Sequence, residues 1–303
     1  MLAVALLGIS FAGPLVRLSA ADPLAIAVWR LGFSLIIVAA FLFWSGEWRQ
    51  WRMLSRREAA IAAAAGVALA LHFWAWNASI HLTTIAASVT LVNLQPAIIV
   101  GISAIVLHEK PTRRQLTGIA LATVGALVIA LPGFASSGAA QASRASFGNL
   151  LAASAAVTAA IYYTIGRHLR ASYGLWAYVG LAYSACFVTL LAFAVVSHVP
   201  LAPQPTREVG IFVALAVGPM LLGHTGMNWA LKFLPAYVVN LTVLGEPVGA
   251  TLLGAILPGI RQIPPAVTLF GGLIMLGGVV IAVQKTIIVR DKTNPAEGIT
   301  PPA

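Results

Sequence analysis

The stretch LTVLGEPVGATLLG, from Leu241 to Gly254, is an apolar run that contains a carboxylate, Glu246, directly before a proline, Pro247. It belongs to a longer apolar segment, 236–257, of about the 20 residues that a helix needs to cross a bilayer. Glu246 is expected roughly 15 Å into that helix, at 1.5 Å per residue. An ionisable group at such depth costs at least about 2.5 kcal/mol, so we expect it to face a wet cavity, bind a polar partner or stay protonated.

The composition extends this interpretation to the whole chain. Of 303 residues, 60% are hydrophobic and only 9% are charged, and the mean hydropathy is +0.93. These values are typical of an all-α integral membrane protein and exclude a soluble globular one. The apolar runs predict ten transmembrane helices, at residues 2–18, 23–44, 58–78, 84–107, 114–131, 147–167, 174–196, 209–231, 236–257 and 264–288.

Little of the chain is left outside these spans. A small and polar connector, 132–146, is expected to be a linker, and the C-terminal tail, 289–303, reads as disordered. No soluble catalytic domain fits in the remainder. Cys186 is the single cysteine and lies within a span, which excludes disulfides and cysteine metal sites.

The net charge of +10 indicates orientation and not a nucleic-acid partner, because the basic residues lie in short loops beside the spans. Basic residues favour the cytoplasmic side, and we therefore place both termini in the cytoplasm. The first apolar run lacks a basic leader and a convincing cleavage site, so we expect a retained helix. The residues expected inside are Arg49, Arg52, Arg56, Arg57, Lys110, Arg113, Arg114, Arg167, Arg170, Lys232, Lys285, Arg290 and Lys292, and those outside are Arg17, Arg144, Arg207 and Arg261.

The chain also repeats itself weakly. An offset of 151 residues aligns WNASIHLTTIAASVTLVNLQPAIIVG, from Trp76 to Gly101, with a stretch that begins MNWALKFLPAYVVNLTVLGEPVGATL. Five helices in each half would make the second half enter the membrane from the opposite side, so we predict two inverted five-helix repeats. The aligned pairs are Asn77 with Asn228, Gln95 with Glu246, Pro96 with Pro247 and, with two more residues inserted, Gly118 with Gly271 and Gly125 with Gly278.

Three segments carry a family resemblance: WRLGFSLIIVAAFLF, the long run TTIAASVTLVNLQPAIIVGISAIVLHEKPTRRQLTGIALATVGALVIA, and EPVGATLLGAIL followed by GGLIMLGGVVIA. With them the chain resembles the drug/metabolite transporter superfamily in its ten-helix form with two EamA-type domains, here 1–131 and 147–288. It looks most like the YddG-type exporters of aromatic and other amino acids. The resemblance implies a central cavity between the halves and alternating access without ATP hydrolysis. The second half departs from the pattern, because LPGIRQIPP lacks the acid that Glu109 supplies in the first half.

We therefore expect a secondary exporter of small amphipathic metabolites, amino acids including aromatic ones, in the inner (cytoplasmic) membrane. The expected partners are a small-molecule substrate and the lipid bilayer, with protons as a candidate coupling ion, and without nucleic acid, cofactor or metal. Motifs of metalloproteases, serine hydrolases and nucleotide-binding loops are absent from the sequence, so an enzyme is not expected. The alternatives are a selective channel or facilitative pore, and a transporter of other metabolites such as purines or drugs.

Polar and aromatic residues inside the spans are the candidates for the cavity. Pairs one helical turn apart, such as His72 with Trp76, share a helix face. For each residue the alternative is structural, because a lone polar side chain often bonds its own helix and a Trp near a span end often anchors at the interface. The candidates are His72, Trp76, Asn77, Asn93, Gln95, Tyr162, Tyr183, His224, Asn228, Asn240 and Glu246.

Three further residues complete the predicted site. Pro96 and Pro247 are expected to kink their helices and shape the cavity or act as hinges, the alternative being a kink that serves only packing. Arg30 is the other intramembrane charge. It is expected either to extend to the interface or to face the cavity, where it would balance Glu246 or attract a carboxylate group.

Overall fold

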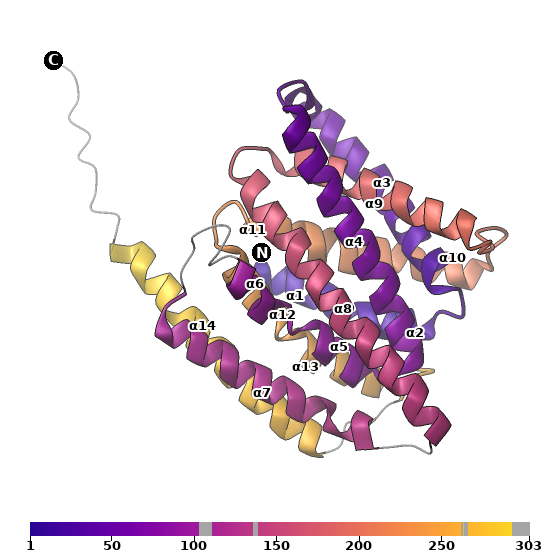
Figure 1. Cartoon of the computed structure of the whole chain (residues 1–303), viewed down its shortest axis with the longest axis vertical. Helices are drawn as coiled ribbons and strands as arrows, with labels where there is room; N and C mark the ends of the chain where they lie inside the picture. The colour runs from indigo at the N-terminus through magenta and orange to yellow at the C-terminus, as the bar shows by residue number, and fades with distance from the viewer. Residues whose placement is uncertain (103–110, 136–138, 262, 264–265, 293–303) are drawn as a thin grey trace.

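The computed structural model describes residues 1–303 except 103–110, 136–138, 262, 264–265 and 293–303. Glu109 and most of the expected tail lie outside the described residues. All regular structure in the described part is helical (Figure 1). The elements are, in chain order, α1 (Leu2–Ser10), α2 (Ala12–Leu18), α3 (Pro23–Trp44), the 3₁₀ helix η1 (Glu47–Arg52), α4 (Arg56–Leu82), α5 (Ile85–Val92), α6 (Gln95–Ile102), α7 (Arg113–Ala135), α8 (Ala139–Arg170), α9 (Leu175–Val196), α10 (Thr206–Leu215), the π-helix η3 (Ala216–Thr225), α11 (Gly226–Ala230), α12 (Ala236–Val243), α13 (Glu246–Ile256) and α14 (Ala266–Lys292).

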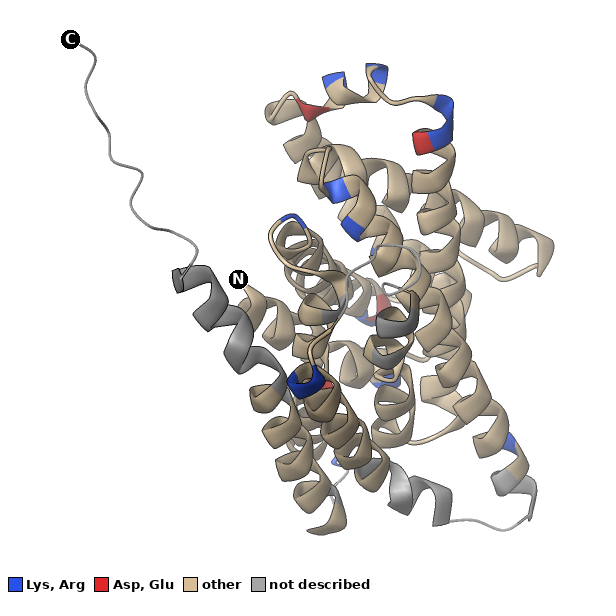
Figure 2. Ribbon diagram, turned by 60° about the vertical axis from the view of Figure 1, so that its left-hand side comes forward, with Lys and Arg blue, Asp and Glu red and all other residues tan. Residues whose placement is uncertain are grey.

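Every predicted span overlaps helical residues in the described part of the chain. Two of these helical segments, Leu2–Leu18 and Leu269–Gly278, are apolar but too short to cross a membrane fully. Figure 2 shows most of the charged positions at loops and helix ends. Six helical stretches are long and apolar enough to cross a membrane: Pro23–Trp44, Arg56–Leu82, Ser143–Arg170, Leu175–Val196, Thr206–Ala230 and Val238–Ile256.

Among the interruptions of predicted spans, two fall at equivalent places in the two halves of the chain. The first lies between α5 and α6 and the second between α12 and α13. The helices α5 and α12 begin and end at residues that are 151 positions apart, and the helices that follow them, α6 and α13, also begin 151 positions apart, at Gln95 and Glu246. At each break the last turn tightens to hydrogen bonds three residues apart, such as Leu94 N–H to Leu91 O at 3.2 Å and Gly245 N–H to Thr242 O at 3.2 Å.

The two prolines stand just after these interruptions. Pro96 is the second residue of α6, and Pro247 is the second residue of α13. A proline in the first turn of a helix has no intrahelical hydrogen bond to lose, and its fixed φ suits that position. Each proline therefore stands in the first turn of a helix that follows a break in the predicted span, and its role as a hinge stays a prediction.

Helices from the first half of the chain pack against helices from the second half. α4 lies along α8 and α9, α3 lies along α9, and α1 crosses both η3 and α13 (Figure 1). The crossing of α1 over α13 is close, because a methyl group at Gly249 would overlap the Ser10 side chain. The centre of the molecule is thus built from both halves. The described part of the expected linker at 132–146 is helical, since α7 ends at Ala135 and α8 begins at Ala139, in a stretch rich in alanine.

The helices α7 and α14 form a tightly packed pair with reciprocal glycine contacts. A Cβ atom at Gly125 would lie 2.7 Å from the carbonyl oxygen of Gly271, and a Cβ atom at Gly278 would lie 2.6 Å from the carbonyl oxygen of Gly118. Without side chains at these points, the two backbones meet directly. The sequence repeat aligns Gly118 with Gly271 and Gly125 with Gly278, and in the structure Gly125 contacts Gly271 while Gly278 contacts Gly118. A two-fold relation between the halves would produce this pattern.

This close approach predicts that Gly125→Ala and Gly278→Ala each destabilise the protein by about 1–3 kcal/mol, because the added methyl group forces the helices apart. Thermal unfolding of the purified protein in detergent measures the effect. Gly277→Ala is the matched control, since nothing lies within 4 Å of a Cβ atom there. It should leave the melting temperature unchanged or raise it slightly through helix propensity. Equal losses in all three variants would refute the glycine contact.

Candidate functional site

A small cavity lies where the interrupted helices meet the centre of the bundle. Its volume is about 20 Å³, which is room for about one water molecule. The apolar part of its lining is Ile9 of α1, Ala12 of α2, Val92 at the end of α5 and Val243 at the end of α12. The polar and aromatic part is Arg30 of α3, His72 and Trp76 of α4, Gln95 of α6, Tyr163 of α8, His224 of η3 and Glu246 of α13.

The lining includes both members of two aligned pairs from the sequence repeat. Val92 and Val243 end the helices before the interruptions, while Gln95 and Glu246 begin the helices after them. The N-terminus of a helix carries unpaired N–H groups and a partial positive charge. Two helix N-termini therefore open on the cavity, one headed by an amide side chain and the other by a carboxyl group.

Arg30 is the positive charge of the cavity. It lies about a third of the way along α3 and has no solvent-exposed surface. Its guanidinium carbon lies 4.2 Å from the centroid of the Phe73 ring, which is a cation–π contact. None of its three side-chain nitrogens has a hydrogen-bond partner among the described residues. The guanidinium is thus held by an aromatic face and keeps all of its N–H donors free.

Glu246 is the acidic group of the cavity and is 3% exposed. It is the first residue of α13, where a carboxylate interacts favourably with the helix dipole. Asn93, in the interruption between α5 and α6, donates its Nδ2–H to Glu246 Oε2 at 3.4 Å and to Val89 O at 2.7 Å. Glu246 and Arg30 do not form an ion pair with each other. The two charged side chains share one cavity and remain apart.

Two histidines and their aromatic neighbours form another wall. His72 donates Nδ1–H to the carbonyl oxygen of Ala155 at 3.0 Å, since a carbonyl can only accept. The His72 ring stacks on Trp76 with centroids 6.4 Å apart and lies 6.0 Å from the ring of His224. No group of three His, Cys, Asp or Glu residues that could hold a metal ion occurs among the described residues. The wall offers aromatic surface together with a few hydrogen-bonding positions.

The π-helix η3 sets the position of His224. A π-helix adds a residue to the turn and is found often at functional sites. His224 lies at its C-terminal end, and its Nδ1 is hydrogen-bonded to the hydroxyl of Tyr163 at 3.1 Å. The Phe73 ring lies edge-to-face against His224 with centroids 5.2 Å apart. Phe73 therefore contacts both Arg30 and His224.

Tyr163 lines the cavity but was missed by sequence reasoning, which selected its neighbour Tyr162. On the same helix, the hydroxyls of Ser154 and Thr158, which lie eight and four residues before Tyr162, bond backbone carbonyls of α8. Tyr162 accepts a hydrogen bond from Asn228 Nδ2 outside the cavity lining. Both tyrosines are buried, so hydropathy could not separate them.

Several other predicted residues lie behind the cavity wall. Asn77 donates to Pro23 O at 3.1 Å and joins α4 to the start of α3. Asn228 also donates to His224 O at 2.7 Å, and Asn240 donates to Ala236 O of its own helix at 2.9 Å. Tyr183 and Thr225 share a hydrogen bond of 2.9 Å between their hydroxyl groups. These side chains support the wall and do not line the cavity.

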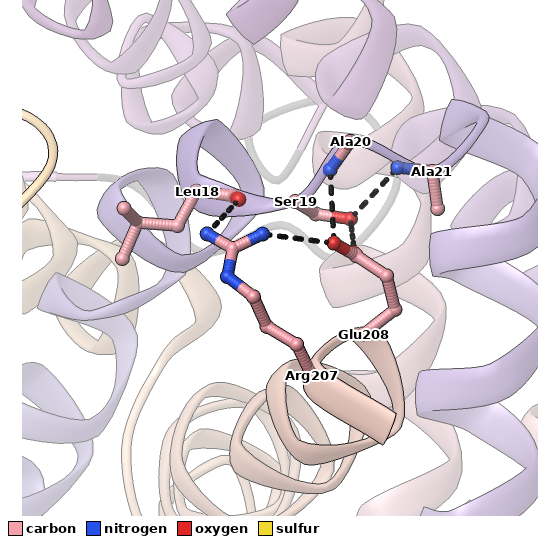
Figure 3. A network of polar contacts seen from close by, with 6 residues as sticks. All are labelled: Leu18, Ser19, Ala20, Ala21, Arg207 and Glu208. Atoms are coloured by element: carbon pink, nitrogen blue, oxygen red, sulfur yellow. Dashed lines mark hydrogen bonds and ion pairs between the residues drawn. The ribbon is translucent and has the colours of Figure 1, made fainter. Parts of the chain in front are cut away.

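At one end of the bundle, a polar network joins the two halves of the chain (Figure 3). Glu208 of α10 is 5% exposed and accepts hydrogen bonds from the Ser19 hydroxyl and from Ala20 N–H, the latter at 3.3 Å. Arg207 forms an ion pair with Glu208 at 3.0 Å and donates to Leu18 O at 2.8 Å. The α10 N-terminus is thereby fastened to the connection between α2 and α3. We call this group of residues, 18–20 with 207–208, the α10 latch.

The opposite end of α3 is also connected to the second half. Glu47 of η1 accepts a hydrogen bond from Ala177 N–H at 3.0 Å, and Gln50 Oε1 accepts one from Gly174 N–H at 2.7 Å. These bonds satisfy backbone donors at the start of α9. Nearby, the hydroxyl of Tyr173 donates to Glu58, and this hydrogen bond raises the pKa of Tyr173. The cavity itself is small, and the residues that line it are buried.

The sequence matches known transporters along most of its length. The EamA-like transporter family matches residues 1–131 and 146–284. An uncharacterized transporter of Archaeoglobus fulgidus is 26% identical over 275 residues, which make up 87% of this chain and 90% of that protein. A protein of known crystal structure has a similar fold, with a TM-score of 0.74 at 18% identity over 97% of both chains.

The two neighbouring tyrosines give a matched test of the cavity wall. Tyr163→Phe removes the hydroxyl group that holds His224, and we expect solute binding to weaken about 3- to 10-fold, the value of one or so hydrogen bonds. Tyr162→Phe should leave binding within about twofold and lower only the melting temperature. Dissociation constants for a panel of amino acids and other small metabolites measure the difference. The assignment of Tyr163 to the site fails if both variants bind equally.

Proposed function

Since the chain belongs to the EamA-like transporter family, we propose that it is a secondary carrier that exports small amphipathic metabolites, most of all amino acids including aromatic ones. The observation that carries the proposal is a small cavity that contains one guanidinium and one carboxyl group between aromatic side chains. Because Arg30 and Glu246 do not pair with each other, both are available to a solute that carries a positive and a negative charge. The aromatic wall suits an apolar side chain.

The proposal includes a membrane topology. Ten crossing helices form two inverted five-helix repeats, 1–131 and 147–288, and both termini lie in the cytoplasm of a cell with this protein in its inner membrane. The equal spacing of the two helix interruptions supports the repeat. The reciprocal glycine contacts between α7 and α14 support it independently. Basic residues in the loops support the orientation.

Alternating access is the proposed mechanism, and the small size of the cavity supports it. With about 20 Å³ of space, the cavity cannot hold an amino acid until helices around it move. We propose that the α10 latch closes one end of the cavity and that the contacts of η1 with the start of α9 close the other. Transport then requires that these contacts break in turn, so that the cavity opens to one side at a time.

A channel is the competing function, and other solutes such as purines or drugs are competing substrates. A selective channel normally uses rings of carbonyl groups or of like charges along an open path. The cavity instead has one basic and one acidic side chain and room for about one water molecule. These features favour a carrier. A single carboxyl group and a single guanidinium also suit an amino acid better than a solute with several negative charges.

Protons are the proposed coupling ion, and Glu246 is their proposed carrier. The groups near this carboxyl group are Asn93, which donates to it, and the other polar members of the cavity lining: Arg30, His72, Gln95, Tyr163 and His224. Glu246 is the acidic member of that lining. A change in its protonation alters the charge that the substrate meets.

Counterflow in proteoliposomes tests the function. Vesicles loaded with an unlabelled amino acid should accumulate the labelled one transiently, because a carrier exchanges solutes across the membrane. Uptake should also depend on a pH gradient. Glu246→Gln should still bind substrate, but more weakly, because its amide oxygen accepts from the ammonium without a charge, and it should lose most of this dependence between about pH 5.5 and 8. Fast uptake that does not saturate would identify a channel, and no uptake of any amino acid would refute the substrate. An unchanged pH profile in Glu246→Gln would exclude its role in coupling.

The α10 latch predicts a difference between two substitutions. Cys186 is the single cysteine, so Cys186→Ser with Ala12→Cys places one thiol in the cavity lining. In this background Glu208→Gln should speed labelling by a membrane-impermeant maleimide, applied from the latch side, by about 3- to 10-fold, because a buried charged hydrogen-bond acceptor is lost.

Arg207→Gln is the control for this experiment. The Arg207 side chain is 61% exposed, and exposed ion pairs contribute little. We expect its labelling rate to stay within about twofold of the parent protein. If Glu208→Gln labels at the parent rate, the latch does not control access to the cavity.

A further inference from the structure

Resting on the proposed function, we infer that Arg30 is the group that binds the carboxylate of the substrate, and that a free carboxylate is therefore required for binding. The ligand class is a zwitterion with an unmodified carboxylate, such as an α-amino acid. The site is the edge of the guanidinium that faces the cavity. The inference rests on a fully buried arginine whose side chain has no hydrogen-bond acceptor among the described residues.

The burial of Arg30 makes its unused donors informative. The residue is 0% exposed, and Nε, Nη1 and Nη2 all lack a hydrogen-bond partner among the described residues. Buried polar groups in proteins are almost always paired, and a buried charge without a partner is costly. A guanidinium has five N–H donors and no acceptor. A group that brings acceptor oxygens into the cavity would satisfy it.

The surroundings of Arg30 fix its position without using its donors. The Phe73 ring lies 4.2 Å from the guanidinium carbon and provides a cation–π contact. That contact stabilises the positive charge through the ring face and supplies no oxygen. A carboxylate binds instead at the edge of a guanidinium, through two parallel N–H···O hydrogen bonds. Phe73 and a carboxylate therefore occupy different parts of the same group.

Glu246 does not take this place. Its carboxyl group lines the same cavity, but it forms no ion pair with Arg30 and accepts from Asn93 instead. It also heads α13, at the favourable end of the helix dipole. The two charged groups thus stay apart, as required to bind the two ends of a zwitterion. Glu246 is the group in the lining that suits the substrate ammonium.

A ligand series on the wild-type protein tests the inference. The probes are L-phenylalanine and L-leucine, the amide of each, and phenethylamine, which has no carboxylate. We expect the amides and the amine to bind about 10- to 100-fold more weakly than the amino acids, because charged hydrogen bonds to the guanidinium are lost. Equal binding of an amino acid and its amide overturns the inference and leaves the proposed function intact. Failure of every amino acid to bind overturns both.

Variants separate a binding role from a structural one. In Arg30→Gln the amino acids should lose about 10- to 100-fold in affinity and the amides should not change, so that the preference for a carboxylate disappears. Arg30→Lys should restore part of the preference, since it keeps the charge and loses the planar fork.

The control is Arg170→Gln. Arg170 is also buried, but its Nε donates to Asn228 O at 3.0 Å and its Nη1 to Tyr173 O, away from the cavity. This substitution should lower the melting temperature and keep the preference for the carboxylate. An equal loss of amino acids and amides in Arg30→Gln would mean that Arg30 only supports the fold. If the Arg30 variants do not fold, the ligand series on the wild-type protein decides.

Discussion

The constraint on which the rest of the structure depends is that backbone polar groups in a membrane must be satisfied inside the protein. An interrupted helix is tolerated there only where it is covered by protein or lines a wet cavity. This chain interrupts α5–α6 and α12–α13 at residues 151 positions apart and brings both interruptions to one cavity. Gln95 and Glu246 stand at the helix N-termini that result. The location of the site is therefore a consequence of where the helices break.

The central charges follow the same logic. Arg30 and Glu246 would each be costly in lipid, but each is held by a weak local contact: Phe73 for the guanidinium, Asn93 and the α13 N-terminus for the carboxyl group. Neither contact neutralises its charge as a direct ion pair would. The guanidinium of Arg30 and the carboxyl group of Glu246 therefore line one small cavity without pairing with each other. A zwitterion that enters would satisfy both at once, which links binding to the opening of the bundle.

The sequence predicts a large part of this arrangement because membrane physics restricts it. Long apolar runs predict the helices, and a charge in such a run predicts a place in the interior, as with Arg30 and Glu246. Side-chain direction was harder to predict. Tyr162 and Tyr163 are both buried in α8, which packs on several sides, so no polar face distinguishes them. The π-helix that sets His224 and the contacts of Glu208 with Ser19 depend on tertiary packing, which single-residue patterns do not encode.

The small size of the cavity bears on the leakage of protons across the membrane. A protein that crosses an energised membrane and contains a continuous file of water would let protons leak, and the leak would grow with every copy made. A cavity with room for about one water molecule is too small for such a file of water in the described part of the protein. Many copies of the protein that are not transporting can then be present in a membrane without dissipating its proton gradient.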